Sequence, residues 1–329
     1  GYNVVAGRAS YGNGSLEHAG GMAGGYVGLM RTGTVSNGQA YDTKLVRAMR
    51  AAGGFAGGIE AGSAASIGDV TLFDKINVDL GALLKTPQVF VPVVKSSSAH
   101  GFRSGLTVRS TGTELNHGMG YAGGYTGYAL GAQIWGDSAL AGQDPSGCNV
   151  LNLRRAAGTS AVGGFVGRAS GGSVASVDTE VSDGLIQSLL DGLIGSPGQL
   201  VDALKATVTT IRGAHVSAAA EPGSAEAAWG FTVEGEYRDG DTTEYATSAG
   251  GFAGSLEASV LGSIEGDLDD STQQLSVNGL RAVEGGAYAG GFFGLGDVGG
   301  VASVGGQGAD AQSGTTLLQL IKLGNVDVL

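Results

Sequence analysis

The chain has 329 residues, of which 42% are hydrophobic and 15% charged, with 64 glycines, 5 prolines and a single cysteine. This hydrophobic fraction is ample for a continuous core, which argues against disorder, and the scarcity of proline excludes collagen. A formal net charge of -12 argues against binding nucleic acid phosphates, and the lone Cys148 excludes an internal disulfide. No apolar run is long enough for a membrane helix and no signal-like segment opens the chain, so we expect any signal or anchor to lie outside this sequence.

A short motif, Gly-Gly-aromatic-x-Gly, occurs six times along the chain. In chain order the copies are GGYVG from Gly24, GGFAG from Gly53, GGYTG from Gly123, GGFVG from Gly163, GGFAG from Gly250 and GGFFG from Gly290. Their aromatic residues are Tyr26, Phe55, Tyr125, Phe165, Phe252 and Phe292. Each ring is the only bulky group between its glycines, so we expect it to point into a core and to stack on the ring of the next copy. The glycines suit positions that need a positive φ or that a neighbouring backbone approaches closely.

The six copies fall into three pairs. Members of a pair lie 29, 40 and 40 residues apart, whereas the gaps between pairs are 70 and 87 residues. A similar opening stretch precedes each pair, and a Leu-rich insertion follows it. We therefore expect three super-repeats, 1–100, 101–217 and a truncated 218–329, within one continuous solenoid.

Short alternating stretches predict β-strands, among them LTVRS from Leu106, SVASVDTEV from Ser173 and FTVEGEY from Phe231. Most copies are also followed by a small hydroxyl residue and a β-branched one: Thr34-Val35, Ser66-Ile67, Ser173-Val174, Ser263-Ile264 and Ser303-Val304. The copy at Gly123 departs from this pattern, with Ile134 and Trp135 instead.

A strand-corner-strand unit that cannot bury its own face must stack on copies of itself. We therefore expect an all-β fold, a β-solenoid of the right-handed parallel β-helix kind, with helical insertions. Turns of roughly 20 to 29 residues would give about ten turns and a rod of roughly 50 Å. The uneven spacing of the motifs disfavours the alternative, a β-propeller with regular blades.

The insertions are expected to loop out of the solenoid. Between Ser182 and Gly213 the apolar residues recur with a helical period and predict a helical hairpin, broken at Gly195 and restarted at Ser196-Pro197. In the first insertion, TPQVFVPVV from Thr86 predicts an extended segment. We expect the apolar faces of the hairpin to cover the rod or each other; the alternative is that they dock a partner.

Together, the six motifs and the hydroxyl and β-branched pairs resemble the GLUG-type repeat of large bacterial surface proteins and adhesins. The resemblance implies a β-helical stalk outside the cell and no catalytic residue. This chain departs from that pattern in preferring Ala before the Gly pair and in lacking the Asn or Cys usual after the β-branched position.

Signatures of common enzymes are missing, since the sequence contains no P-loop, no HExxH and no GxSxG. GLGDVG from Gly294 matches the dinucleotide-binding pattern GxGxxG, but it lies inside a repeat without a βαβ context, so no dinucleotide site is expected. The calcium-like GGQGADAQS from Gly305 and two acidic stretches, RDGDTTE from Arg238 and GDLDD from Gly266, are expected to be turns. The four histidines have no ligand spacing. These are His18, His100, His117 and His215.

Two further sets of residues would matter if the protein acted on polysaccharides. Acidic residues at comparable distances after their motifs are expected to form a solvated edge, and aromatic residues able to stack sugars are expected to cap the end of a core. The acids are Asp69, Asp178 and Asp267, and the aromatics are Trp135, Trp229, Tyr125 and Tyr128.

The sequence therefore favours a non-catalytic stalk or adhesive segment of an extracellular bacterial surface protein, with neither cofactor nor metal. Its partners would be a host glycan, a host protein or neighbouring surface proteins, and not nucleic acid. One alternative is a β-helix polysaccharide lyase or hydrolase, which would gather carboxylates, Lys or Arg on one face. The other is a self-assembling extracellular matrix or filament unit whose insertions mate between chains.

Overall fold

The computed structural model describes residues 1–7, 21–61, 91–112, 120–136, 147–171, 208–218, 230–236, 247–262 and 274–297, and the backbone of short strands at 66–67, 176–177, 303–304 and 315–316. All regular elements in these ranges are β-strands. They include no helix long and apolar enough to cross a membrane.

The strands form four long parallel sheets, named A to D, and a small sheet E. Sheet A contains β1 (Tyr2–Val5), β5 (Gln39–Ala48), β10 (Ser98–Gly101), β11 (Leu106–Ser110), β15 (Cys148–Gly158), β20 (Ala214–Ala218), β21 (Phe231–Gly235), β25 (Leu275–Asn278) and β26 (Leu280–Glu284). Sheet B contains β2 (Met22–Gly24), β6 (Ala51–Gly53), β12 (Tyr121–Gly123), β16 (Ala161–Gly163), β22 (Ser248–Gly250) and β27 (Tyr288–Gly290). Sheet C contains β3 (Val27–Met30), β7 (Ala56–Glu60), β13 (Thr126–Leu130), β17 (Val166–Ser170), β23 (Ala253–Glu257) and β28 (Phe293–Asp297).

Sheet D contains β4 (Thr34–Ser36), β9 (Val93–Lys95), β14 (Gln133–Trp135), β19 (Thr209–Arg212) and β24 (Ser259–Leu261). Sheet E contains β8 (Ser66–Ile67), β18 (Ser176–Val177), β29 (Ser303–Val304) and β30 (Thr315–Thr316). Its β29 and β30 pair antiparallel, whereas all other pairings among the described strands are parallel.

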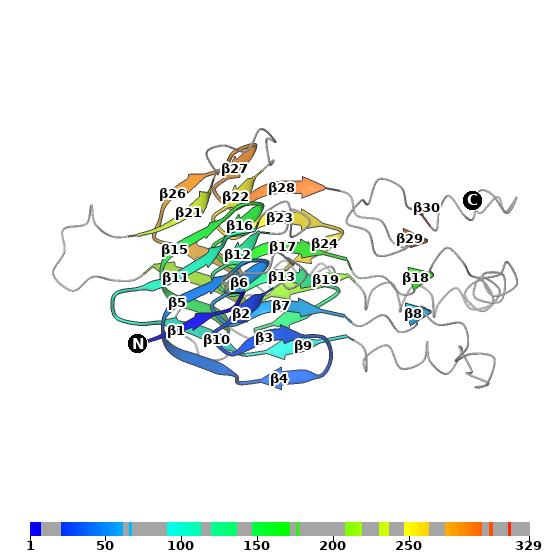
Figure 1. Cartoon of the computed structure of the whole chain (residues 1–329), viewed down its shortest axis with the longest axis horizontal. Helices are drawn as coiled ribbons and strands as arrows, with labels where there is room; N and C mark the ends of the chain where they lie inside the picture. The colour runs from blue at the N-terminus through cyan, green and yellow to red at the C-terminus, as the bar shows by residue number, and fades with distance from the viewer. Residues whose placement is uncertain are drawn as a thin grey trace, which may run out of the picture.

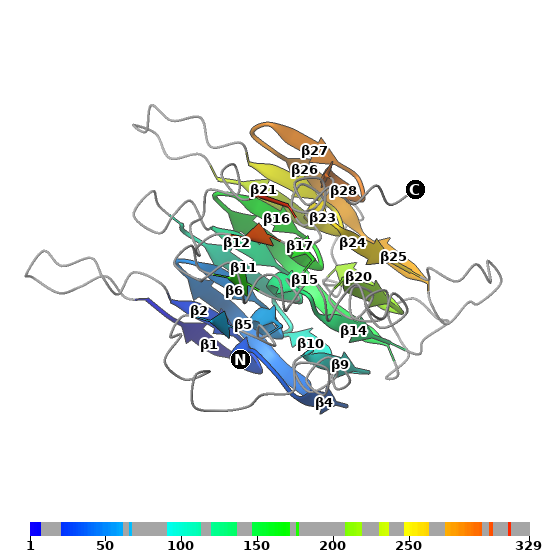
Figure 2. The same cartoon turned by 90° about the vertical axis from the view of Figure 1, so that its right-hand side faces the viewer.

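The chain passes through sheets A, B, C and D in that order and then returns to sheet A one strand further along (Figure 1). Successive turns lie side by side, from the blue β1 and β4 to the orange β27 and β28 (Figure 2). The fold is thus all-β, with parallel sheets and a solenoid-like winding. Turns are numbered below from turn 1, which begins at β1, to turn 6, which begins at β25.

The described chain makes six turns, so the sequence-based expectation of about ten is wrong. Only the step from Gly24 to Gly53, 29 residues, falls within the expected turn length, and the step from Gly163 to Gly250 takes 87. Turns 1 to 5 each cross sheets A to D, and the connections between strands add residues without adding turns. Five steps of about 4.8 Å place the first and last turns about 24 Å apart, half the expected length.

The six motifs occupy one position in successive turns. Their first glycines are direct partners across sheet B, from Gly24 opposite Gly53 to Gly250 opposite Gly290. The six rings lie in a single stack, as the motif predicted, with centroids 4.6 to 4.9 Å apart and planes within 13° of parallel. The four inner rings are fully buried, whereas Tyr26 in turn 1 is 50% exposed and Phe292 in turn 6 is partly buried. Offset stacking adds about 0.5–1.5 kcal/mol per ring pair beyond the burial of apolar area.

Close backbone approach, and not positive φ, explains the motif glycines. A Cβ on Gly124 would lie 2.1 Å from the carbonyl oxygen of Gly164 in the next turn, and a Cβ on Gly123 would lie 2.1 Å from the carbonyl oxygen of Thr126. Positive φ occurs instead at bends, at Asn37 and Ser96 between sheets D and A and at Asn152 midway along sheet A. Of the two roles expected for the motif glycines, the structure therefore confirms the close approach of a neighbouring backbone.

The strand predictions hold for LTVRS, which is β11, and for FTVEG, which is β21. The hydroxyl and β-branched pairs, however, do not share one position. Thr34-Val35 lies in sheet D, where Val35 aligns through Val94 with Ile134, so the copy at Gly123 is no exception. Ser66-Ile67 lies in sheet E and pairs with Ser176-Val177, not with the expected Ser173-Val174. In turns 2, 4 and 6 the chain passes from sheet C into sheet E, whereas in turns 1, 3 and 5 it passes from sheet C directly into sheet D.

Most of the expected helical hairpin lies outside the described residues. Its last part is wrong, because Thr209–Arg212 is strand β19, whose β-branched residues pair with β14 and bury Ile211. Of the extended segment expected from Thr86 to Val94, the last two residues, Val93 and Val94, lie in β9, and residues 86–90 fall outside the described residues. The super-repeat limits at 100/101 and 217/218 fall inside β10 and β20, and the sheets run on across both.

Candidate functional site

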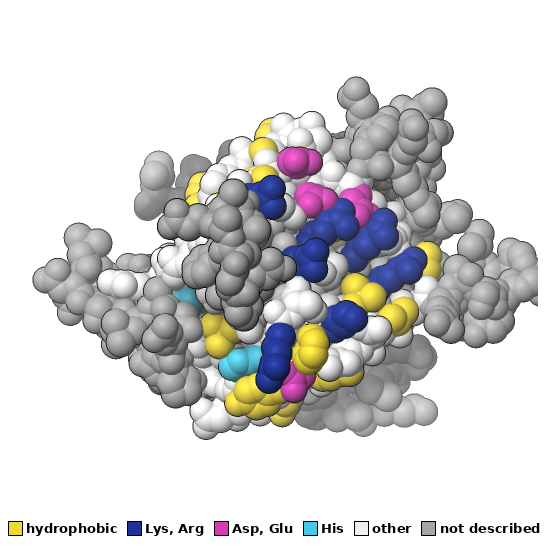
Figure 3. Space-filling view, turned by 90° about the vertical axis from the view of Figure 1, so that its left-hand side faces the viewer, with side chains coloured by type: hydrophobic (Ala, Val, Ile, Leu, Met, Phe, Trp, Pro, Cys, Tyr) yellow, Lys and Arg dark blue, Asp and Glu magenta, His cyan; other side chains and the backbone are white. Residues whose placement is uncertain are grey.

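Charged side chains gather on the outer face of sheet A (Figure 3). Because side chains alternate between the two faces of a strand, Val108 and Val233 point into the core while Arg109 and Glu234 point outward. The parallel register carries one column from Arg47 through Arg109 to Glu234 and Glu284. Along this column, the cations lie in the earlier turns and the acids in the later ones.

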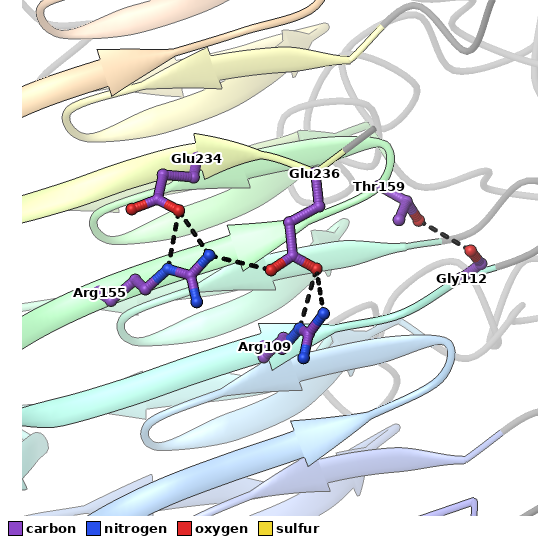
Figure 4. A network of polar contacts seen from close by, with 6 residues as sticks. All are labelled: Arg109, Gly112, Arg155, Thr159, Glu234 and Glu236. Carbon is purple, nitrogen blue, oxygen red and sulfur yellow. Dashed lines mark hydrogen bonds and ion pairs between the residues drawn. The ribbon is translucent and has the colours of Figure 1, made fainter. Parts of the chain in front are cut away.

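An ion-pair network joins turns 3, 4 and 5 on this face (Figure 4). Nε of Arg109 donates to Oε2 of Glu236 at 2.8 Å, and Arg155 donates to Oε1 of the same carboxylate at 3.0 Å. Arg155 also donates to Oε2 of Glu234 through Nε at 2.8 Å and Nη2 at 2.5 Å. Beside the network, the Thr159 hydroxyl donates to the carbonyl of Gly112 at 3.0 Å.

Within the network, contact between Arg155 and Glu234 favours the charged form of both groups. Burial raises the pKa of Glu234, but hydrogen bonds from Arg155 and Thr232 outweigh it, so the net pKa is lowered. The hydrogen bond to Glu234 likewise raises the pKa of Arg155. A general acid of a glycoside hydrolase needs the opposite shift. The arginines are 36% and 41% exposed, so each pair stabilises the fold modestly and serves mainly to tie turns together.

A second cluster of polar and aromatic side chains comes from the strands of sheets B and C that flank the Gly-Gly motif. Tyr121 and Tyr128 meet edge to face, with centroids 6.2 Å apart. The Tyr128 hydroxyl donates a short hydrogen bond to Glu60, which also accepts from Arg31 at 2.6 Å. Burial, followed by the Glu60 carboxylate, raises the pKa of Tyr128. The phenol therefore stays protonated and acts as a fixed donor.

Arg168 extends this cluster to turns 4 and 5. It donates to the Tyr121 hydroxyl at 2.8 Å and to Oε2 of Glu257 at 2.6 Å. Burial lowers the pKa of Arg168, but Tyr121 and Glu257 more than offset it, so the net pKa is raised. Arginine engages both carboxylates of the cluster, Glu60 and Glu257, and the cluster therefore works as a brace between turns.

Two of the aromatics weighed for sugar stacking, Tyr125 and Tyr128, make contacts within the solenoid instead. Tyr125 is fully buried in the ring stack, and burial, with a smaller effect of the neighbouring Cys148 thiol, raises its pKa. Tyr128 belongs to the brace. Trp135 lies between two cations, with Nζ of Lys95 5.3 Å and the guanidinium carbon of Arg212 4.2 Å from its ring centroid.

The two described histidines lie in different turns and do not meet. Nε2 of His100 lies 2.8 Å from Oε1 of Gln39, and burial lowers the pKa of His100 against the opposing effect of Asp42. His215 is buried, with Nδ1 2.9 Å from the Ser276 hydroxyl. In the part of the chain that the structure describes, no three His, Cys, Asp or Glu side chains are grouped as metal ligands.

Several expectations fall outside the described residues. They concern His18, His117, Trp229, Asp69, Asp178, Asp267, the two acidic stretches and the calcium-like stretch. Sequence reasoning in turn missed Arg109, Arg155, Glu234 and Glu236. The available signal was the alternation in LTVRS and FTVEGEY, which turns Arg109 and Glu234 outward but does not show that they meet.

The chain matches no family model, no curated protein and no solved structure.

Proposed function

We propose that this chain is a non-catalytic stalk or adhesive segment of a bacterial cell-surface protein and works outside the cell. The observation that supports this proposal is the ring stack, which passes in register through all six motif-bearing turns. A body whose turns share one core resists bending, and its outer faces repeat side-chain positions about every 4.8 Å. Such a body suits both carrying a load and presenting a regular surface to an extended ligand.

Two further features agree with this proposal. On sheets A and C, Arg109, Arg155 and Arg168 each form an ion pair with a glutamate from a later turn, so these side chains connect turns of the solenoid. The motifs resemble the GLUG-type repeat, whose known setting is the bacterial cell surface. The winding we propose is that of a right-handed parallel β-helix, and the proposed partners are host glycans or surface proteins.

The test is a binding screen of the wild-type chain against a glycan array and a panel of extracellular-matrix proteins, followed by product analysis on every glycan that binds. We expect binding without any change in the glycan. A heat-unfolded sample of the same chain serves as the control for binding that does not need the fold. Release of shortened or unsaturated sugars by the wild-type chain would replace this proposal with the polysaccharide-acting alternative.

The exposed rings at the two outer turns favour a second candidate, a self-assembling unit. Tyr26 in turn 1 and Tyr288 and Phe293 in turn 6 are 46 to 50% exposed. A further turn of the same kind would cover them, whichever chain supplied it. Light scattering against concentration tests this candidate. A mass that rises with concentration in the wild type, but not in Tyr26→Ser/Phe293→Ser, supports it, and a constant monomer mass refutes it.

A further inference from the structure

The outer face of sheet D carries a column of alternating cationic and aromatic side chains. Lys95 of β9, Trp135 of β14 and Arg212 of β19 are direct partners in the parallel register of turns 2, 3 and 4. Both cations approach the indole ring, at 5.3 Å for Lys95 and 4.2 Å for Arg212. Lys95 is exposed, and the other two are half-buried. We name these three residues the sheet D column.

Among the described residues, no acidic side chain forms an ion pair with the two cations of the sheet D column. On sheets A and C, by comparison, four arginines form ion pairs with glutamates: Arg31 with Glu60, Arg109 with Glu236, Arg155 with Glu234 and Glu236, and Arg168 with Glu257. The outward residues of sheet D are instead Thr34, Ser36, Val93, Gln133, Thr210 and Val260, with no acidic residue among them. Within the part of the chain that the structure describes, Lys95 and Arg212 therefore have no acidic partner and can pair with an anion from outside.

Trp135 holds the cations in place before any ligand arrives. The attraction between a cation and the face of an indole ring limits the rotamers of the lysine and arginine side chains. Because Lys95 and Arg212 are two strands apart, their positions along the stack differ by about 10 Å. The spacing runs along the solenoid axis, so it matches a ligand that carries anionic groups at regular intervals along an extended chain.

We propose that the sheet D column binds a linear acidic glycan that lies along the stack across turns 2 to 4. One carboxylate or sulfate group pairs with Lys95 and the next with Arg212, while the sugar between them packs on the exposed edge of Trp135. Hydroxyl and amide groups of Thr210 and Gln133 lie one side-chain position away on the same face and suit sugar hydroxyls. This inference rests on the proposed adhesive function and names its ligand class.

Two other anionic ligands fit less well. A nucleic acid duplex carries one charge per roughly 1.7 Å of its axis, a much denser spacing than that of two cations on strands about 10 Å apart. A single small anion would need two cations converging on one point, whereas the strands that carry Lys95 and Arg212 are two apart, with the strand of Trp135 between them.

The experiment measures binding of the full chain to heparin, to polygalacturonate and to neutral dextran by titration calorimetry. Heparin tests for sulfate groups and polygalacturonate for carboxylates. We expect the wild type to bind at least one of the two acidic glycans and not dextran, with affinity falling as salt rises. Lys95→Ala/Arg212→Ala should weaken that binding at least tenfold.

The matched control is Lys44→Ala/Arg47→Ala, which removes the same two charges from exposed positions on sheet A. It should change the affinity less than twofold. Equal weakening by both double variants would show a diffuse charge effect and overturn the assignment to sheet D, as would a wild type that binds neither acidic glycan. Circular dichroism verifies that each double variant is folded, and the single variant Lys95→Ala, at an exposed position, serves if the double one is not.

The outcome also separates this inference from the proposed function. Binding of another ligand in the screen, without any acidic glycan, ends the sheet D assignment and leaves the adhesive role. Binding of polygalacturonate with release of products keeps the site and ends the non-catalytic role.

Discussion

Gly124→Ala should break the solenoid at its middle. Gly124 is the second glycine of the motif in turn 3, and a Cβ there would lie 2.1 Å from the carbonyl oxygen of Gly164 in turn 4 and 3.0 Å from Cγ1 of Val150. Ordinary contacts begin near 3.4 Å, so the two backbones would have to part by more than 1 Å. The obstacle is backbone and cannot rotate out of the way.

The cost follows from what that displacement breaks. The amide of Gly124 donates to Gly163 at 3.2 Å and the amide of Tyr125 to Phe165 at 2.8 Å, and both bonds cross the gap that must widen. Two backbone hydrogen bonds contribute about 2 kcal/mol net, and the adjoining ring pair, with centroids 4.6 Å apart, adds about 1 kcal/mol. With the overpacking strain itself, we expect a loss of about 3–5 kcal/mol, a large share of the stability of a typical domain.

Urea unfolding followed by circular dichroism measures this loss, and Gly291→Ala is the matched control. Gly291 is the same motif residue in turn 6, where a Cβ would meet nothing within 4 Å, so the control should stay within about 0.5 kcal/mol of the wild type. Equal unfolding free energies for Gly124→Ala, Gly291→Ala and the wild type would refute the close-approach explanation of the motif glycines.

Three further predictions test other parts of the structure. Phe165→Ala removes a fully buried ring between Tyr125 and Phe252 and should cost about 3–5 kcal/mol in urea unfolding, whereas Tyr26→Ala, at the exposed end of the stack, should cost about 1 kcal/mol or less. The pKa of Glu234 is lowered by folding, so the carboxylate stabilises the fold above its unfolded pKa of about 4.3, and this contribution, about 0.5–1 kcal/mol, disappears as pH falls through the folded pKa. The difference in melting temperature between wild type and Glu234→Gln should therefore shrink between pH 6 and pH 3; a constant difference would contradict the ion-pair explanation. Cys148 is buried, so a thiol reagent should label it only after unfolding, in step with the loss of circular dichroism; rapid labelling of the folded chain would show that this part of the core is open.

The direction in which some charged side chains point can be predicted from the sequence alone. Alternation along β11 and β21 determines that Arg109 and Glu234 face outward, and any reader of LTVRS and FTVEGEY could infer it. Which of these charges meet depends on how far the chain travels between turns. Glu236 reaches Arg109 across 127 positions of sequence, and no local signal carries that distance. The same holds for Trp135, whose indole ring gains its two cations from turns 2 and 4.

By itself, the sequence predicted the parallel all-β fold and the stacking of the rings. A bulky ring between glycines can be buried only against rings of other copies, and the open edge of each strand must form hydrogen bonds with a strand of the next copy. The sequence did not determine the number of turns, since the chain length between motifs includes connections of any size. Only the tertiary structure decided why the glycines are needed, which hydroxyl and β-branched pairs align, and which charges remain free on sheet D. Those outcomes depend on distances between backbones of neighbouring turns, and such distances arise only when the turns are stacked.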